Sequence, residues 1–248
     1  MFRVRNLSSP LDRLLLPLHR WVWSDVQRRG RKLLVFAETE ADGGRDLARA
    51  AELTRDGVLR RLYLRHSEDE QRHALLFRTR AREILSSAGP ASQGFDASFF
   101  APGERGLDDL RIDQPEDSLL AFLHLSEKAA AGRFAVYESV LSADAPTRDV
   151  FRDILKDEAF HMSYTRRQLS RIAPRQQGVR LWQARLVRFW KLYLRIATAV
   201  ASVLGTLLLR VQYFVLLPIF ALLAKRAAKT EPDGFAKARR ASALTSQY

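Results

Sequence analysis

The sequence contains the same arrangement twice: an isolated glutamate followed 30 or 31 residues later by Glu-x-x-His. The residues are Glu40, Glu70 and His73 in the first copy and Glu127, Glu158 and His161 in the second. In an α-helix, residues three apart lie one turn above each other on one face, so each Glu-x-x-His can direct a carboxylate and an imidazole at one point. The arrangement therefore predicts helices whose acidic and imidazole side chains converge on a common centre.

Each copy has the pattern of a helical hairpin. A turn signal lies about halfway between the isolated glutamate and the motif, at residues 55–57 in the first copy and at residues 142–146 in the second. A helix rises about 1.5 Å per residue, so folding each copy back at its turn brings the glutamate level with the motif. Pro146 suits the first turn of the helix that follows it. We therefore predict two similar antiparallel hairpins.

Residues 87–118, between the two hairpins, are rich in Gly, Pro and Ser. About 30 residues are enough to run the length of a bundle, so the second and third helices can lie parallel. The predicted fold class is therefore all-α, a four-helix bundle with one long crossover. Gly43 and Gly44 follow closely after Glu40. A glycine inside a helix costs about 1 kcal/mol relative to alanine, which indicates a need either for close helix packing or for access to the centre.

Asp69 and Asp157 immediately precede the glutamates of the two Glu-x-x-His motifs. A histidine that binds a metal usually donates its second ring N–H to a carboxylate or carbonyl, which fixes the tautomer of the ring. We expect the two aspartates to accept these hydrogen bonds. The expected arrangement is crosswise, with Asp69 paired to His161 and Asp157 paired to His73.

With these residues the sequence resembles the ferritin-like di-iron carboxylate superfamily, in which two helices each supply one Glu and two others each supply Glu-x-x-His. The resemblance covers about residues 30–172 and extends to rubrerythrins and demethoxyubiquinone hydroxylases. It implies a ferritin-like bundle that holds two iron ions, or a manganese and iron pair, since carboxylate and imidazole ligands suit both. The implied metal ligands, which are also the implied catalytic residues, are Glu40, Glu70, His73, Glu127, Glu158 and His161.

Within this set, Glu70 and Glu158 are the expected bridges between the two ions. The alternative is a plain helical bundle with exposed acidic residues. A single Glu-x-x-His would not distinguish the two, because Glu and His are common on helix surfaces. The plain bundle, however, leaves the repeat and its regular spacing unexplained.

The sequence has no cysteine. This composition excludes disulfides, zinc ribbons, iron–sulfur clusters and the cysteine-ligated iron module of rubrerythrins. Any electron donor is therefore expected to be external. The lack of cysteine also fits a location at the cytoplasmic face of a membrane. The N-terminus has no small-residue cleavage site and is not typical of a signal peptide.

The C-terminal part of the chain combines positive charge with apolar residues. Residues 175–248 contain 13 Lys and Arg but only two acidic residues, so the bundle is nearly neutral. Basic residues share one face of a helix predicted at 180–195, which also carries aromatic residues, and an apolar segment follows at 196–224. This apolar surface argues against nucleic acid and for a membrane lipid surface as partner. Trp21 and Trp23 can lie at the same surface.

The apolar segment would be about 44 Å long as one helix, which is enough to cross a hydrocarbon core of about 30 Å. Arg210 opposes a crossing because it would lie near the midplane, and both flanks of the segment are basic. We therefore favour a segment that lies in the membrane plane or is re-entrant, bent at Pro218, with Arg210 buried between the protomers of a homo-oligomer. The alternatives are a spanning helix and a soluble oligomerisation helix.

The expected organisation has four parts. They are an N-terminal amphipathic segment (1–29), the di-iron bundle (30–174), basic amphipathic and hydrophobic membrane-associating helices (175–229) and a basic disordered tail (230–248). The apolar helical extension departs from demethoxyubiquinone hydroxylases, so a quinone is not the expected substrate.

Two functions fit these observations. The first is a membrane-associated di-iron monooxygenase or oxidase that activates O₂ to attack a lipophilic small-molecule substrate. The second is an iron-handling protein of the rubrerythrin or ferritin type, a ferroxidase or peroxide scavenger that its extension attaches to a membrane. A tRNA hydroxylase would also use such a bundle, but it should carry a basic patch there, and this bundle is nearly neutral.

Overall fold

The computed structural model describes residues 10–88 and 114–230, and all regular structure in these ranges is helical. The helices are α1 (Pro10–Leu14), α2 (Leu16–Ser24), α3 (Val26–Leu53), α4 (Gly57–Ser87), α5 (Glu116–Val140), α6 (Ala145–Ile172), α7 (Gln177–Val211) and α8 (Leu217–Thr230), with a π-helical turn (Gln212–Leu216) before α8. The all-α prediction is confirmed for the described residues. The chain forms two compact units, Met1–Lys191 and Leu192–Tyr248.

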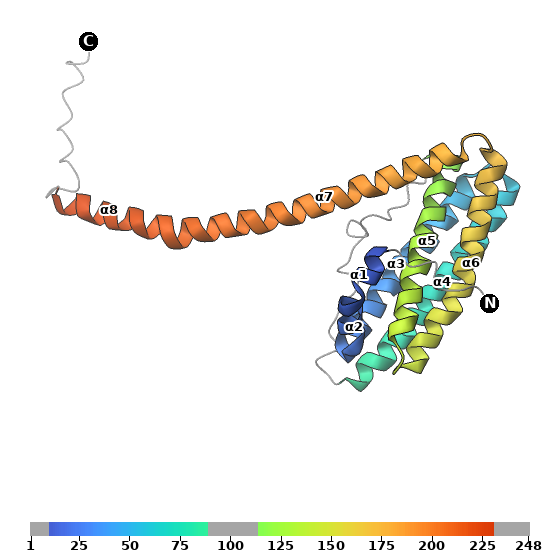
Figure 1. Cartoon of the computed structure of the whole chain (residues 1–248), viewed down its shortest axis with the longest axis horizontal. Coiled ribbons are helices and arrows are strands. Elements are labelled where there is room, and N and C mark those ends of the chain that lie inside the picture. The colour runs from blue at the N-terminus through green and yellow to red at the C-terminus, as the bar shows by residue number, and fades with distance from the viewer. Residues whose placement is uncertain (1–9, 89–113, 231–248) are drawn as a thin grey trace, which may run out of the picture. The chain divides into compact units, whose positions relative to one another are not determined.

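Helices α3 to α6 lie side by side in the first unit as a bundle (Figure 1). The two most extensive helix pairings are α3 with α4 and α5 with α6, each joined by a short turn. Thr54, which caps the end of α3, donates a hydrogen bond to Glu116 at the start of α5. Helices α4 and α5 therefore start at the same end of the bundle and run parallel, as predicted. The predicted crossover falls mainly on residues 89–113, outside the described residues.

Both hairpin turns end in an aspartate that caps the next helix. Asp56 accepts hydrogen bonds from the backbone N–H groups of Val58 and Leu59 at the start of α4, at 2.8 and 3.1 Å. Asp144 accepts one from the backbone N–H of Thr147 at 3.1 Å at the start of α6. Such caps satisfy N–H groups that have no partner within the helix. The turns predicted at residues 55–57 and 142–146 are confirmed.

Two hydrophobic clusters fill the bundle. One cluster is rich in aromatic residues and includes Trp23, Phe77, Phe134, Tyr137 and Phe151. The other is mostly aliphatic and includes Leu47, Leu59, Leu120, Tyr164 and Leu169. Burying a large apolar side chain stabilises a fold by roughly 1.5–3 kcal/mol, so these clusters account for most of the stability of the bundle. Along each of α3 to α6, the predicted ligand residues lie between the two clusters.

Trp23 corrects the expectation for the N-terminal segment. Its side chain is only 3% exposed and packs against Tyr137 and Phe151, with ring centroids 5.0 and 5.4 Å apart. Trp21, two residues earlier, is 56% exposed. Trp23 therefore belongs to the core of the bundle and not to a lipid-facing surface. The sequence pattern missed this because α2 has one buried position among basic and exposed neighbours.

The first turns of α7, residues 177–191, pack on α5. Leu181 and Ala184 pack against the aliphatic cluster. Arg180 forms an ion pair with Asp117 at 2.7 Å, and Arg188 donates to the hydroxyl of Ser126 at 2.9 Å. These basic residues were expected to face lipid, but here they bind the bundle. The large apolar residues of the same stretch stay exposed; they are Trp182, Leu186, Phe189 and Trp190.

In the second unit the described residues are helical from Leu192 to Thr230. Pro218 does not end the helix. Proline has no N–H and its ring clashes with the carbonyl four residues earlier, and the π-helical turn just before α8 relieves this clash: the N–H of Leu217 donates to the carbonyl of Gln212, five residues back. The bend was expected at Pro218, and the widened turn lies immediately before it, a feature at which helices commonly bend.

The continuous helix of the second unit is apolar and exposed. Residues 177–227 form the one helix, among the described residues, that is long and apolar enough to cross a membrane, and its most apolar stretch has no buried residue. Large exposed apolar surfaces usually mark an interface with lipid or protein. The structure thus gives a coarse indication of membrane association.

Candidate metal centre

The polar layer between the two hydrophobic clusters brings together the side chains that the sequence predicts to bind metal. They are Glu40 on α3, Glu70 and His73 on α4, Glu127 on α5, and Glu158 and His161 on α6. Glu158 is 1% exposed and both histidines are fully buried, whereas Glu40 is half-buried. Burying a carboxylate is costly unless a proton or a cation neutralises it, so this layer needs positive charge. The role of these residues as ligands stays a prediction.

The donor atoms of the layer form two groups. The first group is Glu40, Glu70 and His73, and the second is His66, Glu70, Glu127 and His161. Within each group, one donor atom from every residue lies within 4.8 Å of the others. Glu70 belongs to both groups, and a carboxylate has two oxygens, so this residue can contact two ions at once. Glu158, the other predicted bridge, belongs to neither group.

The two histidines predicted as ligands are each hydrogen-bonded to an aspartate of the opposite hairpin. The Nε2 atom of His73 lies 3.0 Å from Asp157, and the Nε2 atom of His161 lies 3.2 Å from Asp69. An ionised carboxylate only accepts hydrogen bonds, so each Nε2 carries the proton and donates it. The hydrogen bond from His161 is the main cause that lowers the pKa of Asp69. This is the crosswise pairing expected from the sequence.

The second ring nitrogen of each histidine, Nδ1, is available to bind a metal ion. Within the described part of the chain, the Nδ1 atoms of His73 and His161 are buried and have no hydrogen-bond partner. His73 Nδ1 lies 3.9 Å from Glu70 Oε2, and His161 Nδ1 lies 3.7 Å from Glu70 Oε1. Ligand distances near 2.0–2.2 Å let one ion bridge atoms separated by such gaps. The residues present therefore fit a metal ion on each side of Glu70.

The carboxyl groups pair within each hairpin. Glu40 donates a hydrogen bond to Glu70, and Glu158 donates one to Glu127. Burial, followed by the negative charge of the neighbouring carboxylates, raises the pKa of Glu40 and of Glu158 well above the ordinary value. Burial also raises the pKa of Glu70, to about 8. Without cations, protons therefore supply much of the positive charge that the layer needs.

Glu127 differs from the other three glutamates. Burial alone would raise the pKa of its carboxyl group, but the charge of His66 and the hydrogen bond from its ring outweigh burial and lower the pKa to about 2. The pKa values of His73 and His161 are lowered, mainly by burial. Both rings are therefore neutral near pH 7, which is the form that binds metal.

His66 is the residue of this layer that the sequence reasoning missed. Its ring is fully buried and stacks on His161, with the ring centroids 3.6 Å apart. His66 precedes Glu70 by four residues, a spacing that places both side chains on one face of α4. That spacing was the available signal. It was missed because the second hairpin has Ile154 at the equivalent position, so the repeat does not include it.

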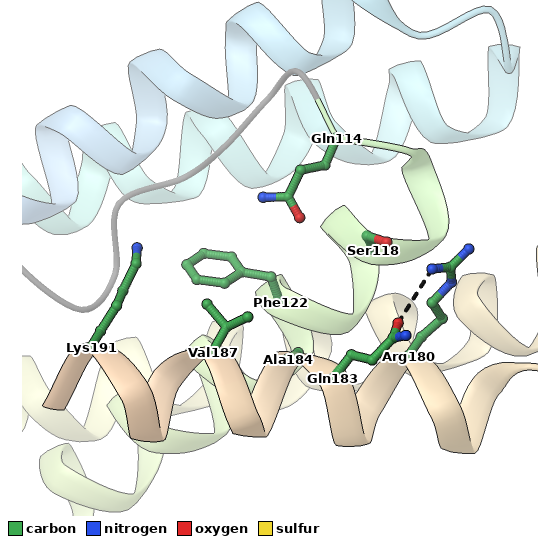
Figure 2. A pocket seen from close by; sticks show the side chains of 8 residues that line it. All are labelled: Gln114, Ser118, Phe122, Arg180, Gln183, Ala184, Val187 and Lys191. Atoms are coloured by element: carbon green, nitrogen blue, oxygen red, sulfur yellow. Dashed lines mark hydrogen bonds between the residues drawn. The ribbon is translucent and has the colours of Figure 1, made fainter. Parts of the chain in front are cut away.

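A surface pocket of about 210 Å³ lies apart from the metal centre, between the start of α5 and α7. Figure 2 shows Phe122 and Val187 at its apolar wall, with Arg180 and Lys191 at the two ends of the drawn set and Gln114 above. Arg180 donates to Gln183 at 3.3 Å across the rim. None of the predicted ligands lines this pocket.

Comparisons with known proteins gave no match, so the function is argued from the geometry of the site. The sequence matches no protein-family model, and it matches neither a curated protein nor a solved structure. In its described residues the chain is thus all-helical, with a buried cluster of His and Glu residues that can hold metal.

Proposed function

We propose that the protein is a membrane-associated di-iron oxidoreductase of the ferritin-like kind, which activates O₂ to oxidise a lipophilic substrate. The observation that supports this proposal most directly is the presence of two donor groups that share Glu70. Two ions that share a carboxylate lie close enough to act on one O₂ molecule together. Iron ions held by these residues would supply electrons for the reduction of O₂, and an external donor would restore them.

The chain itself would perform three tasks at this centre. Asp69 and Asp157 fix the tautomers of the two histidines, so that their Nδ1 atoms point at the ions. The two hydrophobic clusters exclude bulk water from both sides of the polar layer. Glu40 and Glu158 release their protons when cations replace them, so we expect the affinity for metal to rise with pH.

The second unit supports the membrane part of the proposal. Its helix exposes Leu208 and Phe214, each 68% exposed, and Phe220, 63% exposed. In the first unit, residues 177–191 of α7 also turn apolar side chains outward, while Arg180 and Arg188 bind α5. A soluble iron store gains nothing from such a surface, whereas an enzyme for a membrane-dissolved molecule must meet its substrate there.

The proposed chemistry is tested by loading the full-length protein anaerobically with Fe²⁺ in detergent that contains its co-purified lipids. The sample is then exposed to ¹⁸O₂ and the lipids are analysed by mass spectrometry. We expect label incorporation or desaturation in a lipid, and none with a variant that lacks both His73 and His161. Stoichiometric Fe²⁺ oxidation with accumulation of a ferric mineral and no altered lipid would support the ferroxidase alternative instead.

The proposed membrane association is tested by flotation with anionic vesicles. We expect full-length protein to float with the vesicles and to be released only partly by high salt, because salt screens charges but does not weaken apolar burial. A chain that ends at Lys191 keeps only part of the exposed apolar surface, so it should float much less than the full-length protein and still bind metal. Full-length protein that is soluble without detergent and does not float would disprove this part of the proposal.

A further inference from the structure

We infer that His66 is a third imidazole ligand of the proposed metal centre, and that Tyr164 is the residue that positions it. The inference rests on the proposed di-metal function and makes it more specific. It assigns unequal ligand sets to the two metal positions: one imidazole on the Glu40 side and two on the Glu127 side.

The position of His66 is that of a ligand. Its Nε2 atom lies 3.0 Å from Oε1 of Glu70 and 3.4 Å from Oε1 of Glu127. Its ring lies over the ring of His161, with an interplanar angle of 29°. The Nε2 atom thus faces the same carboxylates as the free Nδ1 atom of His161, which lies 3.9 Å from Oε2 of Glu127.

Tyr164 holds the Nδ1 side of the His66 ring, which leaves Nε2 facing the carboxylates. The Nδ1 atom of His66 lies 2.7 Å from the phenolic oxygen of Tyr164, and both side chains are buried. Without metal, Nε2–H of His66 donates to the carboxylates, and the tyrosine oxygen pairs with Nδ1: it accepts from Nδ1–H when the ring is charged and donates to Nδ1 when the ring is neutral. When Nε2 binds a cation, the ring proton must move to Nδ1, where the same tyrosine oxygen accepts it. Tyr164 satisfies both tautomers because a hydroxyl donates and accepts.

This pair has no counterpart on the other side of the centre. The residue equivalent to His66 in the second hairpin is Ile154, which belongs to the aromatic-rich hydrophobic cluster, and the residue equivalent to Tyr164 in the first hairpin is Leu76, which packs against that cluster. One metal position therefore has a polar His and Tyr pair beside it, and the other has hydrocarbon. Imidazole favours Fe²⁺ and Co²⁺, whereas carboxylate-rich sites suit Mn²⁺. The His66 side should accordingly be the more selective against Mn²⁺.

The inference is tested by anaerobic titration of the full-length protein with Co²⁺, followed by calorimetry and visible absorption. The wild type should bind two ions. In H66Q one ion should bind as before, while the other binds about 10–100-fold more weakly with altered d–d bands. H124Q is the matched control, because His124 is a half-buried histidine that faces the backbone carbonyl of Met162, 3.1 Å from Nδ1. It should bind like the wild type.

The Y164F variant tests the positioning role, since it removes the hydroxyl and keeps the ring. We expect the same ion to bind about 10-fold more weakly while helix content is kept, and metal-free thermal stability should fall only by the loss of one buried hydrogen bond. Unchanged Co²⁺ affinity and spectra in both H66Q and Y164F would overturn the inference and leave the proposed centre intact. A wild type that binds no Co²⁺ or Fe²⁺ would overturn the proposed function itself.

A measurement on the wild type covers the case in which the variants do not fold. Protein labelled with ¹⁵N-histidine is saturated with Zn²⁺, and the ring nitrogens are followed by long-range ¹H–¹⁵N spectroscopy. Three histidines should shift to metal-bound values, one through Nε2 and two through Nδ1. Two shifted histidines, both bound through Nδ1, would contradict the inference.

Discussion

The two hairpins present the same predicted ligands in different surroundings. Each supplies two glutamates that share a hydrogen bond and one histidine whose Nε2 binds an aspartate of the other hairpin. They differ one turn before Glu-x-x-His, where α4 has His66 and α6 has Ile154. The shared residues can hold two ions, and the difference makes the two positions unequal. A centre that binds and reduces one O₂ molecule can use such inequality, because the two ions then need not do the same work.

The turns of the two hairpins also differ, in how deeply the capping aspartate is buried and in how many arginines contact it. Asp56 caps α4 from a half-buried position and pairs with Arg171. Asp144 caps α6 from a buried position and is contacted by Arg80 and Arg29, at 2.9 and 3.2 Å. The second turn is therefore tied to both helices of the first hairpin. The bundle is held together at this end by polar contacts as well as by the aromatic-rich cluster.

The largest loss of metal binding is expected when the histidine that both hairpins supply is removed from each. The double variant H73A/H161A takes one imidazole from each hairpin and should lose nearly all bound iron, a drop in affinity of more than about 100-fold. Helix content should be kept, because the hydrophobic clusters provide most of the stability. Metal analysis and circular dichroism measure the two quantities. Full metal occupancy in this variant would refute the predicted ligand set.

The crosswise aspartates are expected to have the next largest effect. D69N and D157N should each weaken the binding of one ion by about 10-fold or more, since Asn can present its N–H₂ group to the ring and favour the wrong tautomer. The pairing can be checked with double variants. D69N combined with H161A should cost little more than H161A alone, whereas D69N combined with H73A should be additive. The opposite pattern would show that each aspartate supports its own hairpin.

The sequence predicted the repeated features of this molecule well and the unrepeated ones poorly. Helices, turns and the meeting of the six side chains follow from spacing, because helical geometry relates distance along the chain to position on a face. His66 has no equivalent residue in the second copy of the repeat. The contact that holds its ring is with Tyr164, which lies 98 residues away in the sequence, so spacing does not reveal it. The amphipathic pattern of residues 180–195 predicted a lipid surface but not that Arg180 and Arg188 bind α5, because such a pattern does not distinguish a lipid surface from a protein surface.

The buried cap at the second turn gives a dependence of stability on pH. Burial would raise the pKa of Asp144, but hydrogen bonds from Thr147 and the guanidinium groups of Arg80 and Arg29 outweigh burial and lower it. The lowered pKa means that the ionised form stabilises the fold above about pH 4, and that this contribution is lost as the pH falls through the pKa of the folded state. Asp144→Asn keeps a capping oxygen but removes the charge.

We therefore expect D144N to lower the free energy of unfolding at pH 7 by about 2 kcal/mol, as for a hydrogen bond to a charged group. The difference from the wild type should shrink below about pH 4, where Asp144 becomes protonated and neutral like Asn. Urea unfolding of metal-free protein at several pH values measures this difference. Asp56, which is less buried than Asp144, is the control, and D56N should have a smaller effect. A difference that stays constant from pH 7 to pH 3 would exclude the charge as the cause.

The smallest predicted effect separates the two glycines of the first hairpin. A Cβ on Gly44 would lie 2.5 Å from the side-chain nitrogen of Gln71 and 3.1 Å from the backbone oxygen of Ser67, whereas nothing lies within 4 Å of a Cβ on Gly43. Gly44 thus permits close packing of α3 on α4 beside the metal centre, where its carbonyl accepts from the Ser67 hydroxyl at 2.7 Å. Gly43 has no such role, and a helix favours alanine there.

G44A should therefore destabilise the metal-free protein by about 1 kcal/mol or slightly more, because the rigid Ser67 backbone must move and Gln71 loses its place. G43A should be neutral or stabilising by up to about 1 kcal/mol. The two variants change neighbouring residues of one helix by the same methyl group, so their difference isolates the packing of α3 on α4. Thermal unfolding of both, side by side, measures it. Equal stability of the two variants would mean that the glycines serve access to the centre and not close packing.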